Sequence, residues 1–363
     1  MKIRKKMKRQ INFNAGPAAL PEQVLQQAAQ AVIEYAGTGL SILELPHRSR
    51  EFKEIIEECK ALVRELCGLD NDYEVIWLQG GGRMQFSMVP MNFLSPGASA
   101  GYIDSGKWAA DAAKYAAFYG TVSILASSKD IGYNRLPQWP TTIDPSLSYV
   151  HFTTNNTIYG TQWQSVSGTS VPLIADMSSD IFSRRHDYSK YSLFYAVAQK
   201  NIGAAGNTMV VIRKDMLASI KNTLPPMLDY RAQVKENSIL NTSNVFGIYV
   251  SLLMLRWTKS QGIDTIERNN ISKAAMLYDA INKSRLFKAY VTEPAHRSPM
   301  NVCFTAISPE AENDLLSLCA KNGITGIKGH RSVGGFRVSL YNAVTIKEVE
   351  QLVEVIKELE ERG

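Results

Sequence analysis

Two stretches, Ala175-Asp176-Met177-Ser178-Ser179 and Ala198-Gln199-Lys200-Asn201-Ile202-Gly203, decide the fold and the chemistry of this chain. Each stretch begins at the end of a short apolar run that is typical of a buried strand. In an open parallel sheet a ligand binds at the carboxyl ends of the strands, so Asp176 and Lys200 are expected to face one site. A carboxylate for a pyridinium nitrogen and an amine for a Schiff base are what a pyridoxal phosphate enzyme needs.

Taken singly, each of these residues also has an ordinary explanation. A lone lysine after a strand is usually a solvated loop charge, and an aspartate there is often a turn residue. The loop Gly80-Gly81-Gly82-Arg83 supports the cofactor hypothesis because it follows an apolar run and precedes a helical pattern, where backbone N–H groups and the helix dipole favour an anion. The loop lacks the GxGxxG spacing of a dinucleotide site and by itself is also a common tight turn. Trp108 is placed to stack on a flat ring, or it packs in the core as most tryptophans do.

The composition fits a globular protein with one large and one smaller domain. The chain has 363 residues, of which 45% are hydrophobic and 20% charged. The net charge of +6 arises in residues 2–9, which carry six basic residues and no acid, so the body of the chain is neutral. No aromatic residue is interleaved with this basic segment, and we therefore expect no nucleic-acid partner.

The sequence also predicts a cytoplasmic protein without a membrane partner. No apolar h-region follows the basic segment, and no window approaches the ~20 apolar residues of a membrane span. The cysteines show no zinc or redox spacing, so no metal site is expected and we interpret them as reduced core residues. These residues are Cys59, Cys67, Cys303 and Cys319.

Hydrophobic periodicity predicts an α/β fold, in which short apolar strands alternate with helices or long connections. Such a pattern favours a large, mainly parallel sheet covered on both faces. The final third differs and predicts a smaller α+β domain. Helices are predicted over residues 21–35, 51–67, 84–93, 107–118 and 263–282 and from 346 behind a Thr345…Glu348 capping box. Strands are predicted over 73–78, 100–104, 121–126, 148–152, 171–175, 193–197, 209–212, near 302 and over 336–340.

We divide the chain into three parts on this basis. Residues 1–12 form a basic N-terminal extension, residues 13–259 a large cofactor-binding domain, and residues 260–363 a small C-terminal domain. The N-terminal segment of the large domain is a candidate to pack on the small one.

A second group of residues points to the substrate. His47-Arg48, His330-Arg331 and Arg337 would suit a substrate with a phosphate and carboxylates, because guanidinium groups bind both bidentately. Scattered cationic residues equally form surface salt bridges, and the sequence alone does not bring residues 48 and 331 together.

The ordered motifs resemble the phosphoserine aminotransferase family, class V enzymes of the fold-type I pyridoxal phosphate-dependent transferases, from Phe13 to Arg362. The motifs that carry the resemblance are Asn14-Ala15-Gly16-Pro17-Ala18, Glu44-Leu45-Pro46-His47-Arg48-Ser49, Gly80-Gly81-Gly82-Arg83, Asp176-Met177-Ser178-Ser179, Ala198-Gln199-Lys200-Asn201-Ile202-Gly203 and Lys328-Gly329-His330-Arg331-Ser332-Val333-Gly334-Gly335.

The resemblance implies a role for each matching position. It makes Lys200 the Schiff-base lysine and Asp176 the partner of the pyridine nitrogen. It makes Trp108 the residue that stacks on the ring. Further cofactor residues implied by the resemblance are Gly82, Arg83, Thr157, Gln199 and, from the neighbouring subunit of a homodimer, Asn241 and Thr242. The implied substrate residues are His47, Arg48, His330, Arg331 and Arg337, the last on an α-carboxylate.

The resemblance further implies amino-group transfer between glutamate and 3-phosphooxypyruvate in serine biosynthesis. The phosphohydroxythreonine step of pyridoxine biosynthesis stays open as a second reaction. Two alternatives are an aminotransferase for an unphosphorylated substrate, such as alanine–glyoxylate or serine–pyruvate aminotransferase, and a phosphate-binding module without catalysis. The paired His47-Arg48 and His330-Arg331 argue against the first. A cofactor absorbance band near 400 to 430 nm that borohydride removes would exclude the second.

Overall fold

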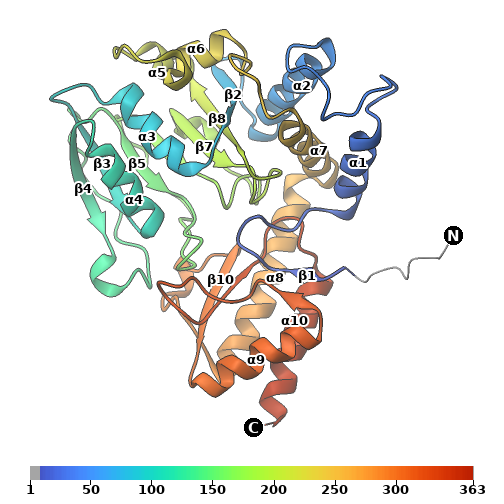
Figure 1. The fold of residues 1–363 in the computed structure, drawn as a ribbon. Helices are drawn as coiled ribbons and strands as arrows, with labels where there is room; N and C mark the ends of the chain where they lie inside the picture. The colour runs from blue at the N-terminus through green and yellow to red at the C-terminus, as the bar shows by residue number, and fades with distance from the viewer. Residues whose placement is uncertain (1–8, 363) are drawn as a thin grey trace.

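The large part of the molecule is built on a seven-stranded sheet, which confirms the predicted α/β class (Figure 1). The computed structural model describes residues 9–362. The strand order is β2-β8-β7-β6-β5-β3-β4, and every neighbouring pair is parallel except the two that involve β8. The strands are β2 (Tyr73–Gln79), β3 (Ser99–Asp104), β4 (Thr121–Ser127), β5 (Val150–Thr153), β6 (Leu173–Asp176), β7 (Leu193–Val197) and β8 (Asn207–Arg213).

Helices cover both faces of this sheet, which explains why its strands are apolar throughout. In β2, Val75 and Trp77 enter one core, whereas the alternating Ile76 and Leu78 enter the core on the other face. The first core lies beneath α1 (Glu22–Ile33), α2 (Arg50–Cys67) and α7 (Val245–Gln261). The second lies beneath α3 (Gly82–Phe93), α4 (Lys107–Ala116), α5 (Lys214–Ala218) and α6 (Tyr230–Lys235).

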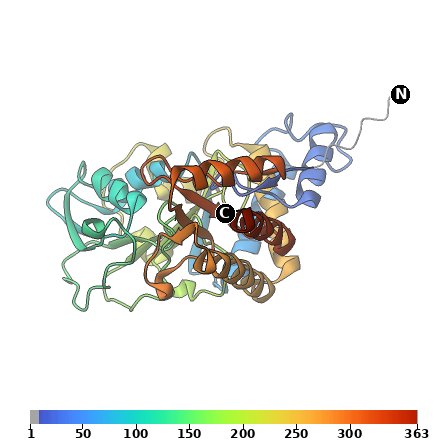
Figure 2. The same cartoon turned by 90° about the horizontal axis from the view of Figure 1, so that it is seen from below.

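The C-terminal third forms a core of its own, drawn in orange and red in Figures 1 and 2. Its antiparallel sheet has the order β12-β10-β9. The N-terminal β1 (Ile11–Asn12) pairs with β11 (Ile324–Thr325) and brings the buried Phe13 into the same core. The remaining elements are α8 (Ile263–Lys283), β9 (Phe287–Ala289), β10 (Asn301–Ala306), α9 (Pro309–Lys321), β12 (Phe336–Ser339) and α10 (Ile346–Arg362).

The predicted capping box at the start of α10 is present. The backbone N–H of Glu348 donates to Thr345 Oγ1 at 3.3 Å, and the N–H of Thr345 donates to Glu348 Oε2 at 2.7 Å. Two otherwise unpaired donors of the first turn are thereby satisfied.

A buried lysine joins α8 to the segment that follows β12. Lys273 is 0% exposed, and its ammonium group donates to the carbonyls of Leu340, Tyr341 and Val344 at 2.9, 3.0 and 2.8 Å. Three carbonyl acceptors match the three N–H donors of an ammonium group. Lys273 therefore fixes the backbone of the segment that carries Tyr341.

The sequence-based prediction missed two long helices, α7 and α9. All residues of α7 from Gly247 to Leu255 are buried, so the helix lacks the polar stripe that reveals a surface helix. Helix α9 has few buried residues, so its hydrophobic pattern is weak. The sequence does carry a start signal for this helix, because the N-cap Ser308 precedes a proline.

The four cysteines are free and buried, as expected of reduced core residues. No helix within residues 9–362 is both long enough and apolar enough to cross a membrane. The basic segment lies outside the described residues except for Arg9, which donates to the carbonyl of Leu20 at 2.7 Å.

Candidate active site

The strand ends bring Lys200, Asp176 and Thr157 to the same edge of the sheet. Asp176 is the last residue of β6, and Lys200 follows the adjacent parallel β7 after a short turn. Lys200 Nζ donates to Thr157 Oγ1 at 3.0 Å. Asp176 Oδ1 accepts from the backbone N–H of Ser178 at 2.9 Å, which fixes the carboxylate at the strand end.

The surroundings of Lys200 favour a free amine. Burial lowers the pKa of Lys200, the nearby Arg337 guanidinium lowers it further, and Asp176 and Asp180 act in the opposite direction. Desolvation and a like charge both penalise an ammonium group. A larger fraction of Lys200 is therefore an unprotonated nucleophile at neutral pH than for a solvated lysine.

The glycine loop opens α3 at the same edge. Gly81 is the N-cap, without a side-chain cap, and a Cβ atom there would meet nothing within 4 Å. The first N–H groups of α3 can therefore face an anion at the positive end of the helix dipole. A Cβ on Gly82 would lie 3.5 Å from Val197 Cγ1, which places this loop against the end of β7.

Trp108, in the first turn of α4, lies beside the glycine loop. The Arg83 guanidinium carbon is 5.6 Å from the centre of its ring. Its indole Nε1 is buried and has no hydrogen-bond partner among the described residues. The ring is therefore held in place by packing, with a donor left for another group.

The N-terminal segment crosses Gln199 and the stem of Lys200. The N–H of Ala18 donates to the carbonyl of Gln199 at 2.9 Å. Gly16 has a φ of +145°, and a Cβ atom there would lie 3.4 Å from Gln199 Cγ and 3.7 Å from Lys200 Cγ. Glycine permits both this conformation and the close approach. Gln199 Oε1 is buried without a partner within the described part of the chain.

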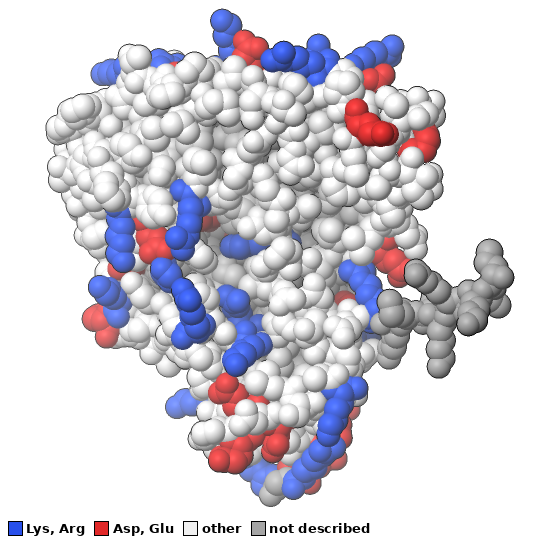
Figure 3. Space-filling view, viewed as in Figure 1, with Lys and Arg blue, Asp and Glu red and all other residues white. Residues whose placement is uncertain are grey.

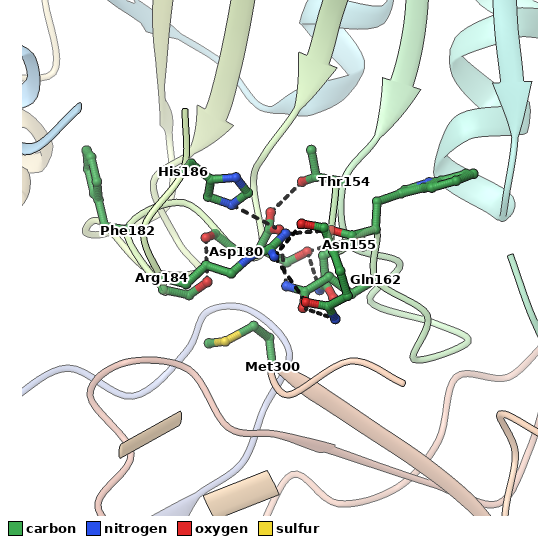
Figure 4. A network of polar contacts seen from close by, with 12 residues as sticks. Thr154, Asn155, Gln162, Asp180, Phe182, Arg184, His186 and Met300 are labelled. Carbon is green, nitrogen blue, oxygen red and sulfur yellow. Dashed lines mark hydrogen bonds and ion pairs between the residues drawn. The ribbon is translucent and has the colours of Figure 1, made fainter. Parts of the chain in front are cut away.

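A buried polar network surrounds Asp180, four residues after Asp176 (Figure 4). The single hydroxyl proton of Thr154 is shared between two acceptors, the carbonyl of Asp176 at 3.1 Å and Asp180 Oδ1. Gln162 Nε2 donates to Asp180 Oδ2 at 3.2 Å, and His186 Nε2 lies 3.9 Å from the same oxygen. Burial raises the pKa of Asp180 to about 6, although the nearby Arg184 and these hydrogen bonds oppose the shift.

Cationic side chains of the C-terminal part complete this side of the site. Arg337, on β12, lies close enough to affect Lys200, and its Nε is buried without a partner among residues 9–362. Partial burial lowers the pKa of His330, and the positive charges of Arg337, Arg331 and Lys107 lower it further. In Figure 3, lysine and arginine side chains gather around the hollow between the larger and smaller parts of this face. Such a surface favours an anionic ligand.

Two predicted groups form no described hydrogen bond or ion pair with Lys200 within one chain. Among the described contacts, no hydrogen bond or ion pair connects His47 or Arg48 with Lys200 or Arg337; both precede the N-cap Ser49 of α2. Asn241 and Thr242 precede α7, and the carbonyl of Thr242 accepts from Gln79 Nε2. Asn241 also lines a cavity of about 300 Å³ beside Gly80.

Sequence reasoning missed several supporting residues, namely Asp180, Gln162, Asn301 and Tyr341. Asp180 carried a signal, because a second carboxylate one turn after Asp176 at a strand end points to the same edge of the sheet. Asn301 Oδ1 accepts from Asn155 Nδ2 at 2.7 Å, and the Tyr341 hydroxyl donates to the carbonyl of Ala15 at 3.0 Å. Neither residue carried a signal in the sequence, since each meets the site only through the packing of distant segments.

Comparison with known proteins agrees with this geometry. The sequence matches the Aminotransferase class-V family over residues 10–352. It is 44% identical to a phosphoserine aminotransferase of Bacillus cereus over 357 residues, covering 98% of this chain and 99% of that protein. The fold and the lysine–aspartate site thus define a class-V aminotransferase.

Solved structures narrow the assignment within that class. Phosphoserine aminotransferase from Bacillus circulans subsp. alkalophilus has a TM-score of 0.95 and 41% identity, covering 98% of this chain and 100% of that one. The PLP-bound phosphoserine aminotransferase from Trichomonas vaginalis has a TM-score of 0.88 and 32% identity, covering 96% and 100%. The chain belongs to the phosphoserine aminotransferase family.

Proposed function

We propose that this protein transfers the amino group between glutamate and 3-phosphooxypyruvate, giving 2-oxoglutarate and O-phosphoserine, in serine biosynthesis. The observation that carries the proposal is the Lys200 amine, which is held by Thr157 at a strand end beside Asp176 and has a lowered pKa. The family membership supports the choice of substrates, because the relatives are phosphoserine aminotransferases.

The unpartnered polar atoms of the site fit pyridoxal phosphate as the cofactor. The start of α3 suits its phosphate, with Gly82, Arg83 and Gln199 as the residues that would hold it. The Trp108 ring would stack on its pyridine, and Thr157 would bond its ring hydroxyl. When bound, the cofactor supplies an aldehyde that condenses with amines and a pyridinium ring that absorbs electrons from the substrate α-carbon.

The residues of the chain then have distinct tasks. Asp176 would hold the proton on the pyridine nitrogen of the bound cofactor, because a carboxylate close to that atom would favour its charged form. Lys200 Nζ accepts the proton from the α-carbon of the amino donor and later returns a proton, acting as base and then as acid. Its lowered pKa suits this exchange because it raises the fraction of free amine above that of a solvated lysine.

The cationic cluster would select the substrate. Arg337 would bind the α-carboxylate shared by both substrates. His330 and Arg331 would bind the group that differs, a phosphate in one substrate and a distal carboxylate in the other. A guanidinium group can bind either anion through paired hydrogen bonds.

We further propose a homodimer with shared active sites. His47, Arg48, Asn241 and Thr242 would complete the site of the neighbouring subunit, which is consistent with the lack of a described hydrogen bond or ion pair between them and Lys200 within one chain. We also propose that the enzyme acts in the cytoplasm, and its four buried free thiols are consistent with a reducing compartment.

A glutamate-coupled assay tests the proposal. The acceptors to compare are 3-phosphooxypyruvate, pyruvate, glyoxylate and the phosphorylated oxo acid of the pyridoxine pathway. We expect a kcat/KM for 3-phosphooxypyruvate at least about a hundredfold above that for pyruvate or glyoxylate, because the unphosphorylated acceptors leave His330 and Arg331 unpaired. Equal values for phosphorylated and unphosphorylated acceptors would refute the proposed specificity.

A further inference from the structure

The side-chain amide of Asn201, the residue directly after Lys200, joins two distant segments at the edge of the site. Its Nδ2 donates to the carbonyl of Ser179 at 3.2 Å, and its Oδ1 accepts from the backbone N–H of Asn342 at 3.1 Å. Ser179 lies three residues after Asp176, in the loop that follows β6, and Asn342 lies in the segment that follows β12. Asn201 is 1% exposed, so both bonds are made away from solvent.

The turn that carries Lys200 is short and is held at both ends. The N–H of Ile202 donates to the carbonyl of Ala198 at 3.2 Å and closes the turn around Lys200. Gly203 then packs directly on α7, where a Cβ atom would collide with the helix. The two Asn201 hydrogen bonds therefore hold a compact piece of backbone from which the Lys200 side chain projects.

The partner of Asn201 in the loop after β6 is itself tied to the segment that carries Thr157. Ser179 Oγ donates to the carbonyl of Asn155 at 2.9 Å and accepts from Asn155 Nδ2 at 2.8 Å. Asn155 precedes Thr157 by two residues. Through Ser179, the Asn201 amide thus connects the Lys200 turn with the residue that accepts the Lys200 hydrogen bond.

The C-terminal partner of Asn201 belongs to the segment that follows the strand of Arg337. Arg337 lies on β12, and Asn342 comes three residues after the end of this strand. Asn342 Nδ2 donates to the carbonyl of Phe182 at 3.0 Å. The backbone N–H that Asn342 offers to Asn201 is therefore held in place by a second contact with the large part of the molecule.

We propose that Asn201 is a positioning residue for the amino-group transfer, because its amide holds the Lys200 turn in one place relative to the loop after Asp176 and the segment after the strand of Arg337. This inference rests on the proposed function, in which Lys200 is the catalytic amine. Both polar groups of the Asn201 amide are engaged by backbone groups, so the residue acts only through the backbone that carries Lys200. Its loss would leave a buried carbonyl and a buried N–H unpaired and would free the turn to shift.

Asn201→Ala removes this amide, and Asn270→Ala is the matched control. Asn270 is 2% exposed, and its Nδ2 donates to the carbonyl of Ser183 at 2.9 Å and to Asn342 Oδ1 at 3.0 Å. Because Ser183 also lies in the loop after β6, Asn270 contacts the same two segments as Asn201 without adjoining Lys200.

The two alanine variants should differ in turnover and not in stability. We expect kcat to fall at least about tenfold in Asn201→Ala, because a displacement of a reacting group by ~1 Å costs up to about a hundredfold. Asn270→Ala should keep kcat within about twofold of the wild type, since the Asn342 bond to Phe182 remains. Both variants should melt at similarly reduced temperatures, because each loses a buried amide with two hydrogen bonds.

A second readout uses the cofactor-free full-length protein and does not depend on activity. The pH midpoint of Lys200 acylation by acetic anhydride, followed by mass spectrometry of the Lys200 peptide, reports the pKa of the amine. Burial and the Arg337 guanidinium lower this pKa in the folded protein. A turn released from Asn201 lets the amine reach water, so the midpoint should rise in Asn201→Ala and stay at the wild-type value in Asn270→Ala.

The outcomes separate this inference from the proposed function. A wild-type protein without turnover would refute the proposed function, yet the acylation midpoint would still measure the influence of Asn201 on Lys200. If an alanine variant does not fold, Asn201→Ser and Asn270→Ser repeat the comparison with a polar side chain retained. A wild-type midpoint in the Asn201 variant, or equal shifts in the Asn201 and Asn270 variants, would show that the positioning role of Asn201 is wrong.

Discussion

Replacement of Lys273 by methionine tests how much the hydrogen bonds of this buried lysine stabilise the C-terminal part of the molecule. Methionine fills most of the volume of the buried side chain but donates no hydrogen bonds. The carbonyls of Leu340, Tyr341 and Val344 then lose their common donor in a region where Lys273 itself is 0% exposed. The perturbation therefore acts through unsatisfied backbone acceptors and leaves the apolar packing nearly intact.

The expected loss of stability follows from the number of acceptors. Each buried carbonyl left without a donor costs about 1 to 3 kcal/mol, and the loss of desolvation cost for the ammonium offsets part of the total. We expect a net destabilisation of about 3 to 5 kcal/mol. With about 2.1 cal/mol/K of unfolding entropy per residue, each kcal/mol shifts the melting temperature of a 363-residue chain by about 1.3 °C. The predicted decrease is about 4 to 7 °C.

Calorimetric melting of the cofactor-free protein measures this decrease, with Lys283→Met as the control. Lys283 lies on the same helix, is paired with Asp279 at 2.7 Å, and has a side chain that is 75% exposed. Its replacement should change the stability by less than about 0.5 kcal/mol. A Lys273→Met variant that melts within about 1 °C of the wild type would show that the three carbonyls do not depend on Lys273.

Three further outcomes are expected. Lys200→Ala should lose both turnover and the absorbance band near 400 to 430 nm, and steady turnover in this variant would remove the basis for its catalytic assignment. Arg331→Ala should lower kcat/KM for 3-phosphooxypyruvate at least about tenfold more than for pyruvate, whereas equal losses would argue against a phosphate pocket. Asp180 has a raised pKa of about 6, so the folded protein binds more protons than the unfolded chain between about pH 4 and 6. Stability should therefore decrease as the pH rises through this window, and thermal melts of Asp180→Asn should lack this component; an identical pH dependence in both proteins would contradict the raised pKa.

The sequence predicted correctly those helices and strands whose hydrophobic pattern matches the burial of their side chains in the structure. Strands such as β7 are apolar runs of ordinary length, and α10 has both an amphipathic face and a capping box. Helix α7 is buried on nearly all sides, so its pattern carries no period. The antiparallel direction of β8 follows from the nine-residue connection after β7, which is too short for a crossover to a parallel strand.

The sequence predicted those site residues that follow the ends of strands or open a helix. Asp176 and Lys200 follow adjacent parallel strands, and Gly82 opens a helix, so topology alone brings them to one edge. Asn301 and Tyr341 reach that edge only because the C-terminal part packs on the loop that carries Asn155 and on the N-terminal segment that carries Ala15. The family resemblance assigned roles to motif positions, but this supporting layer depends on contacts between distant segments.

The central claim is that Lys200 carries the cofactor, and one measurement tests it directly. The full-length protein is loaded with pyridoxal phosphate, reduced with borohydride, digested and mapped by mass spectrometry. We predict a single reduced adduct, on the peptide that contains Lys200, and loss of the absorbance band in the reduced protein. An adduct on another lysine, or no adduct in a protein that binds the cofactor, would contradict this account.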